Sequence, residues 1–408
     1  MDRGIVITGI GVISPIGMGR EPFWDALHKG TTGFREISLF DTSSYNVHTA
    51  GEISDFDPVV FLGKKGLRTL DRSTRLICSA AKLAIDDAGL TINDENTHLM
   101  GVSVGATFGS LHSISQFDRE GLIEGPRYVN PSFFPNTVIN SPASQVSIRF
   151  KIKGFNSTIS TGFCASIDSL IYASDFIRLG RAETVLSGGV EELCEETYML
   201  FHNLGYLSGM DGTEPVCSPF DAYRNGTILG EGAAILILES KEHALKRGAH
   251  IFAKVSGYAN SFDPSADKDY GSGKGLINAI KLSLKDASKD VSDIDFICSG
   301  ANSTRGLDLM ETAAIKAVFG ELAYSVPISA VKSMLGETFS ASGSMALSAA
   351  VASLNEDFLP PTVNYGERDP ACDLDYIPNT PREKRVNTVI VLSSDPYGNN
   401  SAVILERW

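Results

Sequence analysis

The sequence of 408 residues predicts an α/β protein whose strands are mostly buried. First, short runs rich in valine, isoleucine and leucine alternate along the chain with longer amphipathic segments of helical period. Second, 43% of the residues are hydrophobic and 21% are charged, which is typical of a globular protein with a substantial core. Because the strand-like runs are apolar along their length, we expect helices to cover both faces of the sheet.

The predicted elements follow one another in a regular order. In the first part of the chain, strands are predicted at residues 4–13, 101–107, 182–192 and 233–240, and helices at residues 75–90 and 167–181. In the second part, strands are predicted at residues 251–259, 294–301, 387–396 and 401–408, and a helix at residues 274–287. Each part therefore has its own set of strands and helices.

The most polar break in the chain is the loop at residues 261–273, which is rich in glycine, serine and aspartate. It separates a longer N-terminal part from a shorter C-terminal one. We divide the chain into residues 1–257 and 258–408, and we expect two similar halves because each has a strand followed by a helix.

Charge and cysteine content exclude several classes of protein. The net charge of −14 argues against a nucleic-acid partner. No apolar run approaches the roughly 20 residues that span a bilayer. The six cysteines are scattered without a CxxC pair, so we expect no disulfide, no metal site and a cytoplasmic location.

Cys164 is the candidate nucleophile. It lies where an extended run, STISTGF, becomes the helix predicted at residues 167–181. Backbone N–H groups at a helix N-terminus favour a thiolate, and a thiolate can take an acyl group as a thioester. The alternative is a buried and inert cysteine.

Two further segments identify a family. The block CSPFDAYRNGTILGEGAAILILE at residues 217–239 and the segment SGGVEE at residues 187–192, together with the turn at Cys164, resemble the β-ketoacyl synthases that act on acyl carrier protein. The resemblance extends over nearly the whole chain. It implies the thiolase fold, with two related α/β halves in five αβαβα layers and a dimer formed through the sheet near the nucleophile. It also implies acyl chains of fatty acid or polyketide type, and no cofactor.

The chain departs from this family at two histidines. The family uses them to bind a malonyl thioester and promote loss of CO₂, supported by a lysine and a glutamate. Here Asn302 stands at the first position and Glu337 at the second, whereas Lys332 is kept. No histidine follows His250, so neither family histidine can be present under any placement of gaps.

These substitutions change the charge of the site. Glu337 as a carboxylate would disfavour a nearby thiolate and repel a malonyl carboxylate. Because a buried charge needs a partner, we expect Lys332 to pair with Glu337 or Glu311. The candidate catalytic residues are therefore Cys164, Lys332, Glu311, Asn302 and Glu337.

The oxyanion hole is also altered. In the family it is formed by the N–H of the cysteine and an N–H from a Gly-Phe-Gly-Gly loop. Here that loop reads SSDPYGNNSA, and Pro396, which has no N–H, stands where the phenylalanine does. Because each lost donor costs roughly 10²–10³ in rate, we expect ordinary condensation to be very slow.

A basic segment is the candidate docking surface for an acidic acyl carrier protein. It contains Lys64, Lys65, Arg68 and Arg72, and a solvated helix face is the alternative. Phe163, directly before Cys164, is bulkier than the family's usual residue, so it either fills the core or narrows the acyl tunnel.

Three functions fit this pattern. The first is a chain-length-factor-like subunit that forms a heterodimer with an active ketosynthase and shapes its acyl tunnel. The second is an acyltransferase that uses Cys164 without decarboxylation. The third is a true condensing enzyme with a rearranged site, for which a homodimer would suffice.

Overall fold

The computed structural model describes residues 3–265 and 272–408, so the middle of the predicted loop at residues 261–273 lies outside it. Its strands are β1 (Ile5–Ser14), β2 (Gly17–Met18), β3 (Arg35–Glu36), β4 (Thr49–Ala50), β5 (Met100–Gly105), β6 (Asn156–Ile159), β7 (Thr184–Glu191), β8 (Gly232–Ser240), β9 (Ala253–Phe262), β10 (Phe296–Cys298), β11 (Ile328–Ser329), β12 (Phe358–Leu359), β13 (Arg382–Glu383), β14 (Thr388–Ser394) and β15 (Asn399–Arg407).

The helices are α1 (Arg20–Lys29), α2 (Pro58–Leu62), α3 (Arg72–Asp87), α4 (Leu111–Ile123), α5 (Ser141–Phe150), α6 (Ala165–Arg178), α7 (Glu195–Asn203), α8 (Lys241–Lys246), α9 (Lys274–Ala287), α10 (Arg305–Phe319), α11 (Lys332–Leu335) and α12 (Ser342–Glu356). Short 3₁₀ helices that bear on the site are η2 (Pro131–Thr137), η3 (Gly162–Cys164) and η6 (Phe339–Ala341). Each element predicted from the sequence is present, with ends shifted by a few residues.

The two halves of the chain repeat one strand order. The N-terminal half has the order β6-β5-β7-β8-β1, and the C-terminal half has the order β11-β10-β14-β15-β9. In the N-terminal half, β5 is parallel to β6 and β7, and β8 is antiparallel to β7 and β1. In the C-terminal half, β10 is parallel to β11 and β14, and β15 is antiparallel to β14 and β9. This repeat confirms the prediction of two related halves.

The halves join where β1 pairs with β9, at Ile5–Ile7 and Ala253–Val255. The division predicted between residues 257 and 258 falls inside β9 and stays a prediction.

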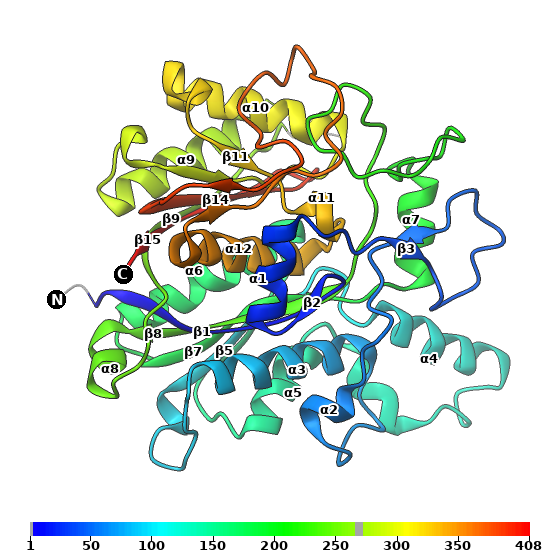
Figure 1. Cartoon of the computed structure of the whole chain (residues 1–408). Helices are drawn as coiled ribbons and strands as arrows, with labels where there is room; N and C mark the ends of the chain where they lie inside the picture. Colours follow the sequence, from blue (N-terminus) through cyan, green and yellow to red (C-terminus); the bar gives the residue numbers. More distant parts are fainter. Residues whose placement is uncertain (1–2, 266–271) are drawn as a thin grey trace.

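Five layers are visible in Figure 1. Helices α3 and α5 cover the outer face of the N-terminal sheet, α6 and α12 lie between the two sheets, and α9 and α10 cover the outer face of the C-terminal sheet. This is the αβαβα arrangement that the family resemblance implied.

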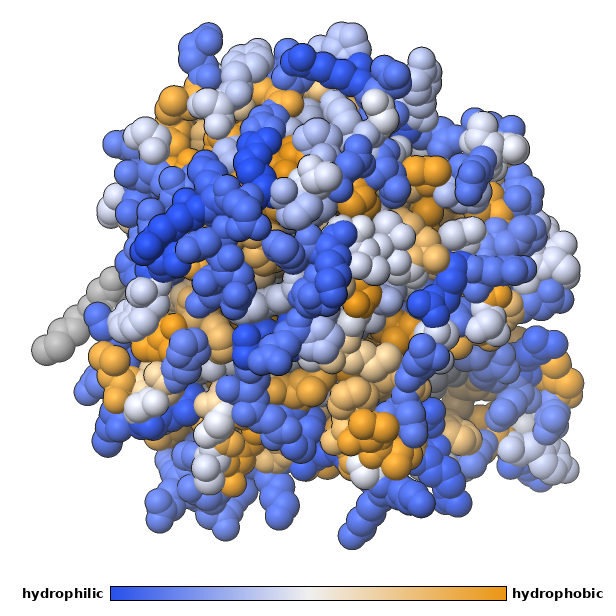
Figure 2. Space-filling view, in the orientation of Figure 1, coloured by the Kyte–Doolittle hydropathy of each residue, from blue (hydrophilic) through white to orange (hydrophobic). Residues whose placement is uncertain are grey.

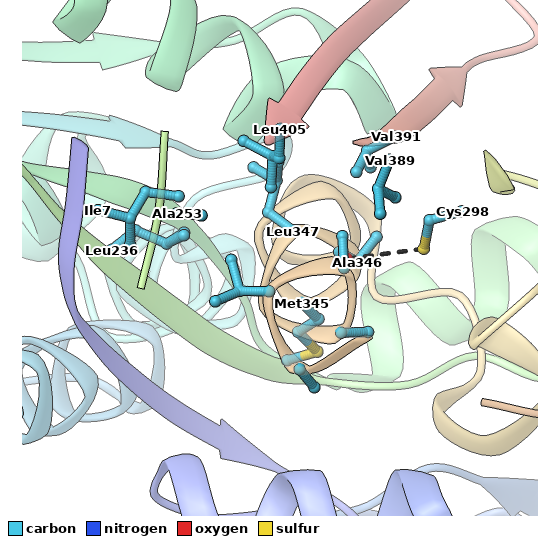
Figure 3. Close-up of a cluster of buried hydrophobic side chains, with 14 of the residues drawn as sticks. Ile7, Leu236, Ala253, Cys298, Met345, Ala346, Leu347, Val389, Val391 and Leu405 are labelled. Atoms are coloured by element: carbon cyan, nitrogen blue, oxygen red, sulfur yellow. Dashed lines mark hydrogen bonds between the residues drawn. The ribbon is translucent and has the colours of Figure 1, made fainter. Parts of the chain in front are cut away.

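The middle layer is the core of the molecule. Helix α12 is buried on all sides from Ser342 to Leu354, which is why its sequence shows small and apolar residues without a polar face. In Figure 3, Met345, Ala346 and Leu347 of α12 lie between side chains of the N-terminal sheet and side chains of the C-terminal sheet. The site described below is attached to this rigid layer.

Hydrophilic residues cover most of the face shown in Figure 2. Hydrophobic residues gather near its lower edge around α2, where Val59 and Val60 are exposed. Within the described residues, no helix has the length and apolar character that crossing a membrane requires.

Candidate active site

Cys164 lies at the predicted junction of an extended segment and a helix. It ends η3 and is the N-cap residue of α6, directly after the parallel strand β6. Gly162 allows the tight turn before it, because its φ of 58° lies in the left-handed region that favours glycine. The cysteine is completely buried.

Burial decides the protonation of this cysteine. It raises the pKa of the Cys164 thiol well above its usual value, and the neighbouring Asp168 and Asp395 raise it further. Hydrogen bonds with Ser393 and Ser401 offset part of this increase. Burial therefore acts against the thiolate that the helix N-terminus is expected to favour.

Sequence reasoning missed the two carboxyl groups beside Cys164. Asp168 lies one turn further along α6 and accepts hydrogen bonds from Thr161 and Ser401, the latter at 2.6 Å. Asp395 lies in the loop between β14 and β15 and is 2% exposed. Burial also raises the pKa of both carboxyls. The i+4 spacing from Cys164 was a signal for Asp168, and the position beside Pro396 was a signal for Asp395.

The residues at the two histidine positions are in direct contact. The Asn302 side-chain amide donates to Oε2 of Glu337 at 2.8 Å, and the Lys332 ammonium donates to the same oxygen at 2.8 Å. The backbone N–H of Phe339 donates to Oε1 at 2.9 Å. All three side chains are buried, so the predicted pairing of Lys332 with Glu337 is confirmed.

Glu311 on α10 has different partners. It accepts hydrogen bonds from the Ser299 hydroxyl and, at 3.0 Å, from the Gly300 N–H. Burial raises the pKa of Glu311 to about 7, and Lys332 acts in the opposite direction. Glu311 therefore lies near Lys332, and within the described part of the chain its hydrogen-bond partners are Ser299 and Gly300.

The oxyanion-hole region offers little to a developing negative charge. The Cys164 N–H donates to the Thr161 carbonyl at 3.2 Å, so this donor is already engaged. Pro396 is buried in the loop that packs on the nucleophile turn and has no N–H to offer. The Ser393 hydroxyl of the adjoining strand donates to the Phe163 carbonyl at 3.1 Å.

Aromatic rings lie between the cysteine turn and the buried Lys332–Glu337 pair. Phe163 is 2% exposed, and its ring centroid lies 5.2 Å from that of Phe339 and 6.5 Å from that of Phe201. The Lys332 ammonium lies 5.9 Å from the Phe163 ring centroid. Phe163 thus packs in the core at the boundary between the thiol and the charged residues.

The basic segment divides into two kinds of residue. Lys64, Lys65 and Arg68 are exposed. Arg72 instead points inward, where its guanidinium donates to both carboxylate oxygens of the fully buried Glu231 and to the Ile53 carbonyl. Arg72 is therefore not available for docking, because its charge is already neutralised inside the protein.

Comparisons with known proteins agree with this architecture. The family model of the β-ketoacyl synthase N-terminal domain matches residues 2–244, and that of the β-ketoacyl synthase C-terminal domain matches residues 252–366. The chain is 34% identical over 410 residues to 3-oxoacyl-[acyl-carrier-protein] synthase 2 of Coxiella burnetii (strain RSA 493 / Nine Mile phase I), covering 99% of each chain.

Similarity extends to polyketide proteins. The chain is 36% identical over 419 residues to the tetracenomycin polyketide synthase ketoacyl synthase alpha subunit of Streptomyces glaucescens, covering 100% of this chain and 97% of the relative. The solved structure of the ishigamide ketosynthase/chain length factor superposes with a TM-score of 0.93 at 35% identity over 100% of both chains. On this evidence, the chain belongs to the β-ketoacyl synthase family.

Proposed function

We propose that this protein is a chain-length-factor-like subunit that does not itself perform decarboxylative condensation. The observation that carries the proposal is the buried contact of Asn302 and Lys332 with Glu337. At the two positions where condensation would need imidazoles, the protein has an amide and a carboxylate. The Asn302 amide and the Lys332 ammonium both donate hydrogen bonds to the Glu337 carboxylate.

The chemistry of this group argues against binding a malonyl thioester. Glu337 accepts three hydrogen bonds from protein donors, which leaves it no role as a donor to a thioester carbonyl. Its negative charge would repel a malonyl carboxylate, and the nearby cation Lys332 is already paired with it. Decarboxylation therefore lacks both the donors and the positive charge that it needs.

A free sheet edge and an apolar face support a partner of the same fold. Strand β6 ends the sheet, with β5 as its one neighbour among the described strands. Next to β6 lie α5, η2 and α4, which contact one another in that order. The exposed apolar residues of these elements and of the loops between them, here called the apolar face, are Leu122, Ile123, Tyr128, Phe133, Phe134, Val138, Ile139 and Ile148.

An apolar face beside an unpaired strand favours association. We propose an active ketosynthase as the occupant, because the similar ishigamide structure is that of a ketosynthase/chain length factor.

The carrier is proposed to dock at Lys64, Lys65 and Arg68, which are exposed cations on a chain of net charge −14. We place this complex in the cytoplasm, a location supported by the six cysteines, all of which are free.

Acyl transfer by Cys164 without decarboxylation is the second candidate. The position of Cys164 at the N-terminus of α6 favours it, since this is where a helix stabilises a thiolate.

The test is the intact mass of the protein and of acyl carrier protein after incubation with acyl-carrier and malonyl-carrier, beside Cys164→Ala. The proposal predicts no β-ketoacyl carrier and no acyl adduct on this protein. A cysteine-dependent acyl adduct without condensation would favour the acyltransferase. A β-ketoacyl product would overturn the proposal and establish a condensing enzyme with a rearranged site.

A further inference from the structure

The loop after β14 folds around the side chain of its own Asp395. Oδ1 of Asp395 accepts from the N–H groups of Tyr397 and Asn399 at 2.9 and 3.0 Å, and Oδ2 accepts from the Asn399 side-chain amide at 2.8 Å. The carboxylate thus fixes the shape of this turn.

The same carboxylate lies against the turn that precedes the nucleophile Cys164. A methyl group added to Gly162 would lie 1.9 Å from Oδ2 of Asp395, so the carboxylate lies directly against the glycine α-carbon. The Ser393 hydroxyl, two residues before Asp395, holds the Phe163 carbonyl. The loop therefore contacts Gly162 through Asp395, and the end of β14 contacts Phe163 through Ser393.

Asp168 is the second carboxyl group near Cys164. This side chain links the cysteine turn through Thr161, strand β15 through Ser401 and strand β9 through Asn260. Among the described residues, Asp168 and Asp395 are thus the carboxyls that enclose a thiol with no solvent exposure.

We propose that Asp395 is a latch that holds the loop between β14 and β15 over the nucleophile turn and keeps Cys164 from reacting with electrophiles. Asp395 acts as a positioning residue, through the loop and Gly162. The inference rests on the proposed function, because a subunit that leaves chemistry to its partner needs its own cysteine kept unreactive.

The test is the rate at which iodoacetamide alkylates each of the six cysteines in the full-length protein, mapped by peptide mass. Wild type is compared with Asp395→Ala and with Asp211→Ala, an exposed aspartate that also caps its own turn. We expect Asp395→Ala to speed alkylation of Cys164 about tenfold or more, because charge-assisted hydrogen bonds that hold the loop are lost. The five other buried cysteines, and every cysteine in Asp211→Ala, should react as in wild type.

Two outcomes would overturn the latch. One is a Cys164 rate in Asp395→Ala equal to that of wild type, and the other is a common increase at all six cysteines, which would make the loop a general folding element. If Asp395→Ala does not fold, Asp395→Asn decides by the same criterion. Alkylation is measured without a partner or a carrier, so a result that overturns the latch would leave the non-condensing role standing. Production of a β-ketoacyl carrier would instead remove that role and leave the latch.

Discussion

Glu337 is the residue on which the charge balance of the site depends. It is the hydrogen-bonded counter-charge of Lys332, and the Lys332 and Glu337 side chains are 5% and 1% exposed. Forming a buried ion pair costs desolvation energy, so the pair itself adds little to stability. Removing one partner is strongly destabilising, because it leaves the other charge buried and uncompensated. This makes the pair a sensitive probe of the site.

Replacing Glu337 by glutamine should destabilise the protein strongly. It leaves the Lys332 ammonium buried without a counter-charge, so we expect the free energy of unfolding to fall by about 3–5 kcal/mol. Urea denaturation measures this loss. Asp25→Asn, which breaks the exposed pair with Lys29, should change the same quantity by at most about 1 kcal/mol. Equal effects of both variants would contradict the buried pairing.

Glu311 predicts a dependence of stability on pH. Its folded pKa is about 7 against an ordinary value of 4.5, so between these values the folded protein keeps a proton that the unfolded chain has released. Stability from this group is therefore present at low pH and lost as the pH rises through this window. Glu311→Gln cannot lose a proton and should show a smaller fall in unfolding free energy between about pH 5 and about pH 8. An unchanged slope would show that Glu311 does not contribute.

Single residues of the site could be predicted from sequence to different degrees. Asn302, Lys332 and Glu337 could be placed because the family resemblance supplied their register, and electrostatics then required a partner for the lysine. Asp168 was missed although its i+4 spacing from Cys164 was a signal, whereas the effect of Asp395 on Cys164 depends on the contact between the cysteine turn and the loop after β14. The inward direction of Arg72 depended on the distant Glu231 in the same way.

At the scale of elements, α6, which begins directly after Cys164, packs closely against α12. A β-carbon at Gly343 of α12 would lie 2.7 Å from both Ile167 and Ser166 of α6. This close approach fixes the helix that begins at Cys164 relative to η6, which precedes α12.

Gly343→Ala should therefore destabilise the protein by about 1–3 kcal/mol through overpacking. The matched control is Gly121→Ala in α4, where the added carbon would make an ordinary contact with Val129 at 3.4 Å. There the gain in helix propensity should raise stability by up to about 1 kcal/mol. Thermal unfolding of both variants gives the comparison, and a stabilising Gly343→Ala would contradict the packing described for α6 and α12.

The amphipathic elements α3, α6 and α9 were predictable because each has a buried and a more polar face. Helix α12 was not predicted, since its residues from Ser342 to Leu354 are all buried and its sequence carries no helical alternation. The least visible helix in the sequence is thus the central one in the fold.

At the scale of the whole molecule, the apolar face lies beside the free edge of β6. If this face binds a ketosynthase, Phe134→Glu should abolish co-purification with that partner, because a charge would be buried in the contact. Val60→Glu on α2, at a residue of 76% exposure outside the apolar face, should leave binding unchanged. Size-exclusion chromatography of co-expressed proteins gives the answer, and binding by both variants would place the partner elsewhere.

The organisation in two halves could be predicted from the strand and helix patterns of each part, but the way in which the two sheets join could not. The pairing of β1 with β9 joins segments that are distant in the chain, and the sequence gives no register for it. The division inside β9 illustrates this, because the strand that begins the second half also continues the sheet of the first.

We propose that the protein supports synthesis by a partner ketosynthase without using its own cysteine. The most direct measurement is the amount and chain length of the product made by an active ketosynthase with acyl and malonyl carriers, alone and with this subunit in wild-type and Cys164→Ala forms. We expect a product whose chain length depends on the presence of the subunit and is identical for the wild-type and Cys164→Ala forms. Loss of product with Cys164→Ala would contradict it and show that Cys164 takes part in the chemistry.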